Sequence, residues 1–237
     1  MPTGARTPAP AAAVIWAGAT DGCRAVTSWS ATLRVAGRVD GERIPTGLVV
    51  HSGLVSSGHL RLEGRVLNRL GFTLAGSADR ALLRLERERE YVLDRAGAIL
   101  SALLGTDLGA DRLLSILTGC GTPEAAIIES AQVGAFLEVS TGGGQVYLQR
   151  EGAAWRPVAA LTSGFQVEYR RFDGPWPADV RIWSDPSSAT PVELRVGIEN
   201  VVINPRLREE AFAVEPPDGW QRVELVSVRR GIGAGGS

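Results

Sequence analysis

The sequence predicts a mainly β protein with a short helical insert, an α+β arrangement built on one curved antiparallel sheet. Through most of the 237 residues, apolar and polar side chains alternate with a period of two, as they do in half-buried strands. In the middle of the chain, apolar residues instead recur at helical spacing. We expect about ten or eleven strands, and a sheet of that size must curl or close. With a single apolar face, it is expected to form an unclosed half-barrel.

The first strands are predicted as an antiparallel meander. Trp29, Leu33 and Val35 share one face of the first strand, and Arg34 and Arg38 share the other. An Asp-Gly hairpin turn follows at residues 40–41. The later strands place these residues on the same apolar face: Leu48, Val50, Leu60, Leu62, Phe72, Leu74, Leu83 and Leu85. The meander therefore has one apolar face and one face rich in Arg and Glu.

Two leucine-rich segments in the middle of the chain predict a pair of short helices. The first covers Ala98–Leu104 and ends at Gly105, and the second covers Leu108–Leu117 and ends at Gly119. The pair contains very few charged residues, so its apolar surface needs a cover. We expect the helices to lie across the concave side of the sheet as a lid, which would leave room for an apolar ligand beneath them.

Strands return after Pro123. A glycine-rich run, Thr141–Gly144, is predicted to be a hairpin turn. A phosphate-binding loop is not expected there, because neither a lysine nor a helix follows the glycines. The strands of this half are predicted over Phe136–Val139, Tyr147–Arg150, Trp155–Leu161, Phe165–Tyr169, Val180–Ile182 and Val192–Ile198.

The last part of the chain contains several breaks. Pro175-Trp176-Pro177 is expected to interrupt the strands, and Pro205 to take the first position of a short helical turn. Val223–Val228 is expected to form a last strand-like piece, and the glycine-rich residues 229–237 a flexible tail. No linker divides the chain before that tail, so residues 24–228 are predicted to be a single domain.

Residues 1–23 are interpreted as a signal or leader segment. Arg6 precedes a short apolar run, Ala11–Trp16, and the small residues at 17–19 match a signal-peptidase site. Pro8 and Pro10 interrupt this pattern. The alternative is a low-complexity start that leads into a short helix.

The chain contains two cysteines, Cys23 and Cys120. We predict one disulfide between them, formed in an oxidising compartment. The alternative is two buried thiols. Because the two residues do not form a CxxC motif, thiol–disulfide catalysis is not expected.

Composition argues against most classes of enzyme. All 25 basic residues are Arg, so no lysine can serve a P-loop or a Schiff base. The two histidines, His51 and His59, are expected on neighbouring strands. A site with Glu63 is conceivable, although exposed histidines on a hairpin are the commoner arrangement. Without a nucleophile motif or a set of metal ligands we expect no catalysis, metal or cofactor, and a net charge of −1 gives no attraction for nucleic acid.

Several runs together resemble a known family. They are Ser28–Arg38 in the first strand, Leu60–Gly64, the helical segments Ile99–Gly105 and Leu113–Cys120, and the ending Ile203-Asn204-Pro205 followed by Phe212–Pro217. Their order resembles the LolA/LolB superfamily of lipoprotein-localisation factors, and more closely a LolA-like envelope family. The resemblance covers about residues 24–226.

The resemblance implies an unclosed half-barrel with a helical lid, which binds lipids or lipoprotein acyl chains in the periplasm or at the outer membrane. It further implies a monomeric carrier that exchanges cargo with envelope transport proteins. The chain departs from the LolB pattern in two ways, because no lipobox precedes Cys23 and the loop Glu86–Glu90 is charged rather than apolar. The alternative function is that of a structural envelope protein with a filled core, which acts through a protein partner.

The residues expected to line the ligand cavity follow from strand and helix phase. They are Leu33, Val35, Leu48, Val50, Leu60, Leu62, Phe72, Leu74, Leu100, Leu103, Leu104, Leu113, Leu117, Val167, Tyr169 and Ile182. A register slip of one residue would invert this set.

Overall fold

The computed structural model describes residues 2–228, apart from 105–108, 121–125, 163, 186–187 and 189. The strands of its first half are β1 (Arg6–Pro8), β2 (Ser28–Val39), β3 (Glu42–Arg43), β4 (Leu48–Val55), β5 (His59–Val66), β6 (Arg69–Gly76), β7 (Ala81–Leu85) and β8 (Glu90–Asp94). Those of its second half are β9 (Ile127–Val133), β10 (Phe136–Thr141), β11 (Gly144–Glu151), β12 (Ala154–Thr162), β13 (Phe165–Asp173), β14 (Trp176–Ser184), β15 (Val192–Ile203) and β16 (Gln221–Arg222).

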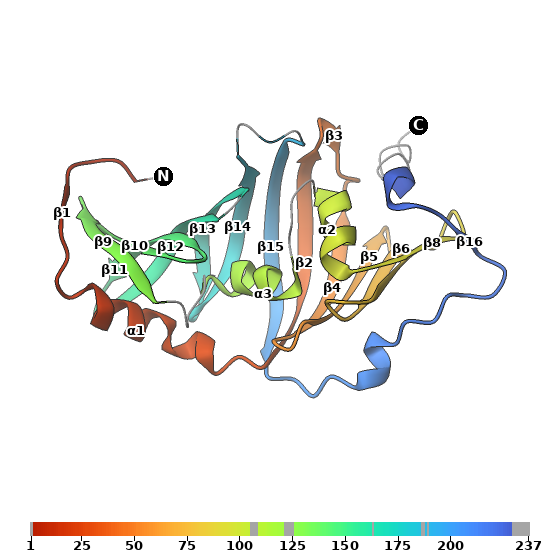
Figure 1. Ribbon diagram of the computed structural model, residues 1–237, viewed down its shortest axis with the longest axis horizontal. Helices are drawn as coiled ribbons and strands as arrows, with labels where there is room; N and C mark the ends of the chain where they lie inside the picture. The colour runs from red at the N-terminus through yellow and green to blue at the C-terminus, as the bar shows by residue number, and fades with distance from the viewer. Residues whose placement is uncertain are drawn as a thin grey trace.

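All of these strands form one open, curved sheet, which confirms the predicted fold class (Figure 1). Their order is β1-β9-β10-β11-β12-β13-β14-β15-β2-β4-β5-β6-β7-β8-β16, with β3 paired only to β2. The pairings are antiparallel except that of β16 with β8, which is parallel. Long-range pairing of β15 with β2 therefore joins the two halves at the middle of the sheet.

The strand count is higher than predicted, since the described residues form a 16-stranded sheet. β1, β3 and β16 have only two or three residues each, too few for a period-two pattern to be visible. β9 was missed as well, because only Ala131 and Val133 of this strand are buried in the core.

The central strands carry the expected inward and outward alternation. Val35 of β2 lies opposite Val196 of β15 and Leu48 of β4, all on the apolar side. On the outer side, Arg34 Nε donates a hydrogen bond of 2.8 Å to Glu199, and this bond lowers the pKa of the Glu199 carboxyl. The outer face thus carries ion pairs, some between neighbouring strands and some between residues two apart on one strand, over an apolar inner face.

The break predicted at Pro175-Trp176-Pro177 is present but shorter, a turn at residues 174–175, because β13 ends at Asp173 and β14 already begins at Trp176. Two other predictions for the second half were wrong in detail. The helical turn begins at Glu209 (η1, Glu209–Phe212) rather than at Pro205, and residues 225–228 are helical rather than extended. The helix end expected at Gly105 and the tail at 229–237 lie outside the described residues.

Asn204 explains why the chain turns after β15. Its backbone adopts a φ of 54°, a left-handed conformation that asparagine tolerates better than most residues. Its side-chain oxygen accepts a hydrogen bond of 2.8 Å from the backbone N–H of Thr27, and its amide nitrogen donates one of 2.8 Å to the carbonyl of Ala25. The residue therefore joins the end of β15 to the start of β2.

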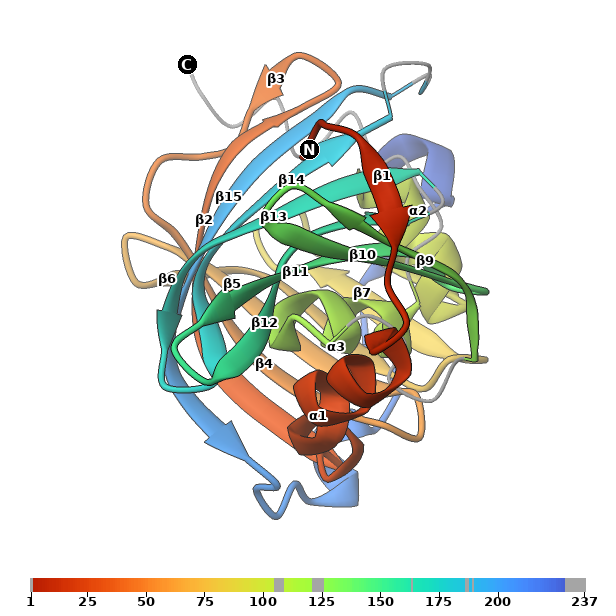
Figure 2. The same ribbon diagram turned by 90° about the vertical axis from the view of Figure 1, so that its left-hand side faces the viewer.

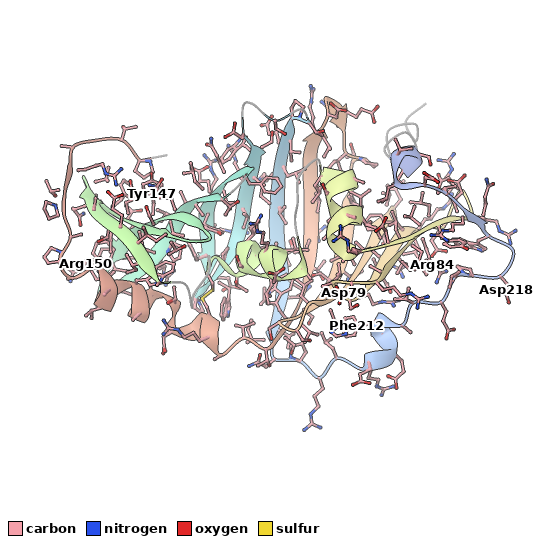
Figure 3. All side chains as sticks on the ribbon, in the orientation of Figure 1. Asp79, Arg84, Tyr147, Arg150, Phe212 and Asp218 are labelled. Carbon is pink, nitrogen blue, oxygen red and sulfur yellow. A yellow bond between two sulfur atoms is a disulfide. The ribbon has the colours of Figure 1, made fainter. Side chains whose placement is uncertain are left out.

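The segment after Asn204 runs over the outer side of the first half of the sheet. Phe212 is buried there, and its ring lies 5.6 Å from that of His59 (Figure 3). Further on, Arg84 lies over the ring of Trp220 at 5.1 Å, and β16 covers part of the β8 edge. The C-terminal segment therefore protects an edge strand that would otherwise expose unpaired backbone groups.

Helix α1 (Ala12–Arg24) packs against the opposite end of the sheet, where it contacts β9, β10 and β12 (Figure 2). Its buried side includes Trp16 and Thr20, and the Thr20 hydroxyl donates a hydrogen bond of 2.8 Å to the carbonyl of Trp16. The interpretation of residues 1–23 as a leader stays a prediction.

The predicted disulfide is confirmed. Cys23 in the last turn of α1 is bonded to Cys120, and their Cα atoms are 5.9 Å apart. Cys120 is buried, so the bond lies inside the fold.

Candidate functional site

The candidate site is a cavity of about 270 Å³ between the concave face of the sheet and two helices. The helices are α2 (Ala96–Leu104), which contacts β7 and β8, and α3 (Ala110–Thr118), which contacts β4 and β14. Figure 1 shows α3 lying across the middle strands. The sheet and the two helices together enclose the cavity, as a lid over a half-barrel would.

The structure brings together all of the predicted lining residues except Leu60, Val167 and Tyr169. These three have the predicted strand phase and are buried in the core, but they lie outside the cavity wall. Strand phase gives the face on which a residue lies, whereas its distance along the strand decides whether it reaches the cavity. The ligand-binding role of the whole set stays a prediction.

Tyr169 shows what lies beyond the cavity wall. A Cβ atom on Gly119 would lie 3.7 Å from the Tyr169 ring and 2.9 Å from Pro177, so the end of α3 packs closely against β13 and β14. Burial raises the pKa of the Tyr169 hydroxyl well above its usual value. The residue is therefore part of the packed core beside the cavity.

The sequence reasoning missed several lining residues. Phe165, Leu194 and Val196 have the same strand phase as the predicted residues, so the alternation could have identified them. Other apolar lining residues are Val39, Ile44, Pro45, Ala102 and Ile116. The polar lining residues are Asp40, Glu42, Arg43 and Thr190. They come from the β2–β3 hairpin and from the segment before β15, where no periodicity marks them.

The lid helix α3 is amphipathic and fixed at its C-terminal end. Leu113, Ile116 and Leu117 face the cavity. Gly119 ends the helix with a φ of 71°, and the N–H groups of Gly119 and Cys120 donate hydrogen bonds to carbonyls of the last turn. This is the predicted glycine helix end. The disulfide then joins Cys120 to Cys23, so this end of the lid is attached covalently to α1, the helix that packs against β9, β10 and β12.

The two histidines do not form a site. His51 pairs with Glu63 and His59 with Val55, so the histidines are separated by four residues along the strand, or roughly 13 Å. The Nδ1 atom of His59 lies 3.1 Å from the Ser57 hydroxyl, and Glu63 forms an ion pair with Arg61. Over the described residues, no group of three or more His, Cys, Asp or Glu residues could hold a metal ion.

A second, wider groove lies on the outer side of the second half of the sheet. It has a volume of about 1050 Å³, and its lining is nearly half polar, with Gln166, Glu168, Arg170 and Arg181 beside Trp183. Of these two, the inner cavity is the one with an almost wholly apolar wall. The inner cavity is therefore the stronger candidate for a ligand without polar groups.

No family model matches the sequence, and no curated protein sequence matches it significantly. Among solved structures, a LolA superfamily protein from Nitrosomonas europaea matches with a TM-score of 0.52 at 10% sequence identity. The match covers 86% of this chain and 97% of that chain. The chain has a LolA-like fold.

Two further solved structures match over similar lengths. One is a putative outer membrane lipoprotein-sorting protein domain from Vibrio parahaemolyticus, with a TM-score of 0.49, 11% identity and coverage of 85% of this chain and 97% of that chain. The other is a DUF1329 family protein from Desulfovibrio piger, with a TM-score of 0.49, 11% identity and coverage of 84% and 94%. At such identities the likeness concerns the fold alone. None of the described helices is both long and apolar enough to cross a bilayer.

Proposed function

We propose that this LolA-like protein carries or binds lipids or lipoprotein acyl chains in the cell envelope, by burying the chains reversibly beneath α2 and α3. The observation that carries the proposal is the apolar cavity between these helices and the concave face of the sheet. An acyl chain has no polar groups to satisfy, so an apolar wall suits it, whereas a polar ligand would lose its hydrogen bonds to water there.

The cavity size supports reversible binding. An apolar cavity of about 150 Å³ takes a six-carbon benzene ring, so one of about 270 Å³ takes on the order of ten carbons. At about 0.8 kcal/mol for each buried CH₂, these carbons contribute on the order of 8 kcal/mol, similar to the cost of association. Binding of one chain would therefore be weak enough to reverse. A longer chain, or a second one, would need the lid to move outward.

The proposed compartment is the periplasm, either free in it or associated with the outer membrane. The buried disulfide supports an oxidising compartment, because cytosolic thiols are normally kept reduced. Cargo exchange with envelope transport proteins belongs to the same proposal.

Charge placed in the lid tests the proposal. Leu103 lines the cavity and is only partly buried, so Leu103→Glu can fold while placing a carboxylate at the cavity wall. The matched control is Leu67→Glu, since Leu67 is 85% exposed in the β5–β6 turn. Displacement of a fluorescent fatty acid should show weaker binding by Leu103→Glu and unchanged binding by Leu67→Glu.

Two further variants keep the test decisive. Leu117→Glu places the charge deeper, and Ala102→Phe fills the cavity without adding charge. Folded variants with full lipid uptake would argue against burial beneath the lid. That result would favour the alternative, a structural envelope protein that acts through a protein partner.

A further inference from the structure

The polar lining residues are gathered at one side of an otherwise apolar cavity. Asp40, Glu42 and Arg43 come from the β2–β3 hairpin and are exposed, so they mark the mouth. Thr190 reaches the same place from the segment before β15. The two segments are joined directly, because the backbone N–H of Asp40 donates a hydrogen bond of 2.7 Å to the carbonyl of Pro191. Figure 1 shows β3 and the start of β15 at the same end of the sheet.

The β2–β3 register separates the charges of the hairpin. Glu42 pairs with Val39, an inward residue of β2 that also lines the cavity. Opposite residues of an antiparallel pair share a face, so Glu42 lies on the cavity side. Arg43 pairs with Arg38 on the outer face, although it still reaches the rim. Asp40 and Glu42 together outnumber Arg43, so the mouth carries a net negative charge.

Thr190 is a second, independent polar group at the mouth. The residue is 7% exposed and lines the cavity. Its backbone groups bond to Ser188, but its hydroxyl has no hydrogen bond within the part of the chain that the structure describes. A hydroxyl oxygen without a partner in the protein is available to accept a hydrogen bond from a ligand at this end of the cavity.

Glu42 is likewise without an ion pair among the described residues, and the same holds for Asp40 and Arg43. A carboxylate and a hydroxyl oxygen both accept hydrogen bonds, and an ammonium group offers three donors and no acceptor. An anionic headgroup would instead meet two carboxylates, those of Asp40 and Glu42, against the one guanidinium of Arg43. The chemistry of the mouth thus complements a positively charged amine.

Resting on the proposed function, we infer that the mouth selects an acyl ligand whose polar end carries an ammonium group. The Glu42 carboxylate pairs with the ammonium, the Thr190 hydroxyl accepts one of its hydrogen bonds, and the alkyl chain enters the apolar cavity. Lipids with an ethanolamine headgroup have this chemistry. Lipids whose headgroup carries only negative charge are disfavoured.

Three twelve-carbon probes test the inference at pH 7: dodecylamine, dodecanol and dodecanoate, each competing below its micelle concentration with a fluorescent fatty acid. They share a chain and differ in head charge. The folded protein should bind dodecylamine most tightly and dodecanoate least. Glu42→Gln should weaken dodecylamine binding by roughly two- to fivefold, the effect of one exposed ion pair, and leave dodecanol binding unchanged. Glu193→Gln, on the outer face opposite Arg38, is the matched control and should change neither.

Thr190 gives a second readout. Thr190→Val should weaken dodecylamine binding by roughly two- to fivefold, the effect of one hydrogen bond, and Thr190→Ser should restore it. Equal binding of all three probes, or equal effects of Glu42→Gln on the amine and the alcohol, would overturn the headgroup inference while leaving the acyl-chain proposal in place. Failure of all three probes to bind would overturn both.

Discussion

Removal of the Cys23–Cys120 disulfide should destabilise the protein substantially, because the bond closes a long loop. The two cysteines are separated by 97 residues. Because the bond closes this loop, it lowers the conformational entropy of the unfolded chain, and this stabilises the native state by about 4.7 kcal/mol relative to the unfolded chain. For 237 residues, the unfolding entropy is about 0.5 kcal/mol/K, so the double variant Cys23→Ala, Cys120→Ala should unfold about 9 °C lower than the wild type.

Circular dichroism melting measures this shift, with dithiothreitol as an internal control. Reductant should lower the Tm of the wild type toward that of the double variant and leave the variant unchanged. A shift below about 2 °C would refute the reasoning, since the bond would then not restrict the unfolded chain. Free thiols in protein purified without reductant would refute it in a different way.

Two further effects follow from buried groups. Burial raises the pKa of the Tyr169 hydroxyl, so above about pH 10 the unfolded chain releases this proton while the native state keeps it. The stabilisation is therefore complete below that pH and is lost as the pH rises. Tyr169→Phe should reduce the fall in the urea midpoint of unfolding between pH 9 and 11. Gly37→Ala should cost at least about 2 kcal/mol, because Gly37 has a φ of 139° and a Cβ there would overlap the carbonyl oxygen of Glu193. The control is Gly18→Ala, because a Cβ at Gly18 in α1 would meet open space, and it should stabilise the protein by about 0.5–1 kcal/mol in the same urea titration. A Tyr169→Phe protein with the pH profile of the wild type, or a Gly37→Ala protein of unchanged stability, would contradict these assignments.

Features with a local, repeated signal were predictable from the sequence. Leu33 and Val35 lie on either side of Arg34 in a period-two pattern, and the structure places both the leucine and the valine on the inward face. Gly119 was predicted to end α3 because glycine readily adopts the left-handed conformation found there. Such features depend on neighbouring residues alone.

Features that depend on distant pairing were not predictable in the same way. Thr190 reaches the cavity mouth only because Val192 pairs with Val39, more than a hundred residues earlier in the chain. His59 contacts Phe212 because the C-terminal segment crosses the outer face, and the helical turn that carries Phe212 starts later than Pro205 suggested. The short edge strands β1 and β16 likewise form only where a partner edge is already in place.

The most direct test of acyl-chain burial is mass spectrometry of the protein purified from its own cell envelope without reductant, first native and then denatured. We predict a native mass that includes a lipid or an acylated peptide, which is lost on denaturation. The denatured mass should be two hydrogens lower than that of the reduced chain, because of the disulfide. A native protein of the same mass as the bare chain, with no lipid released on denaturation, would contradict the carrier account.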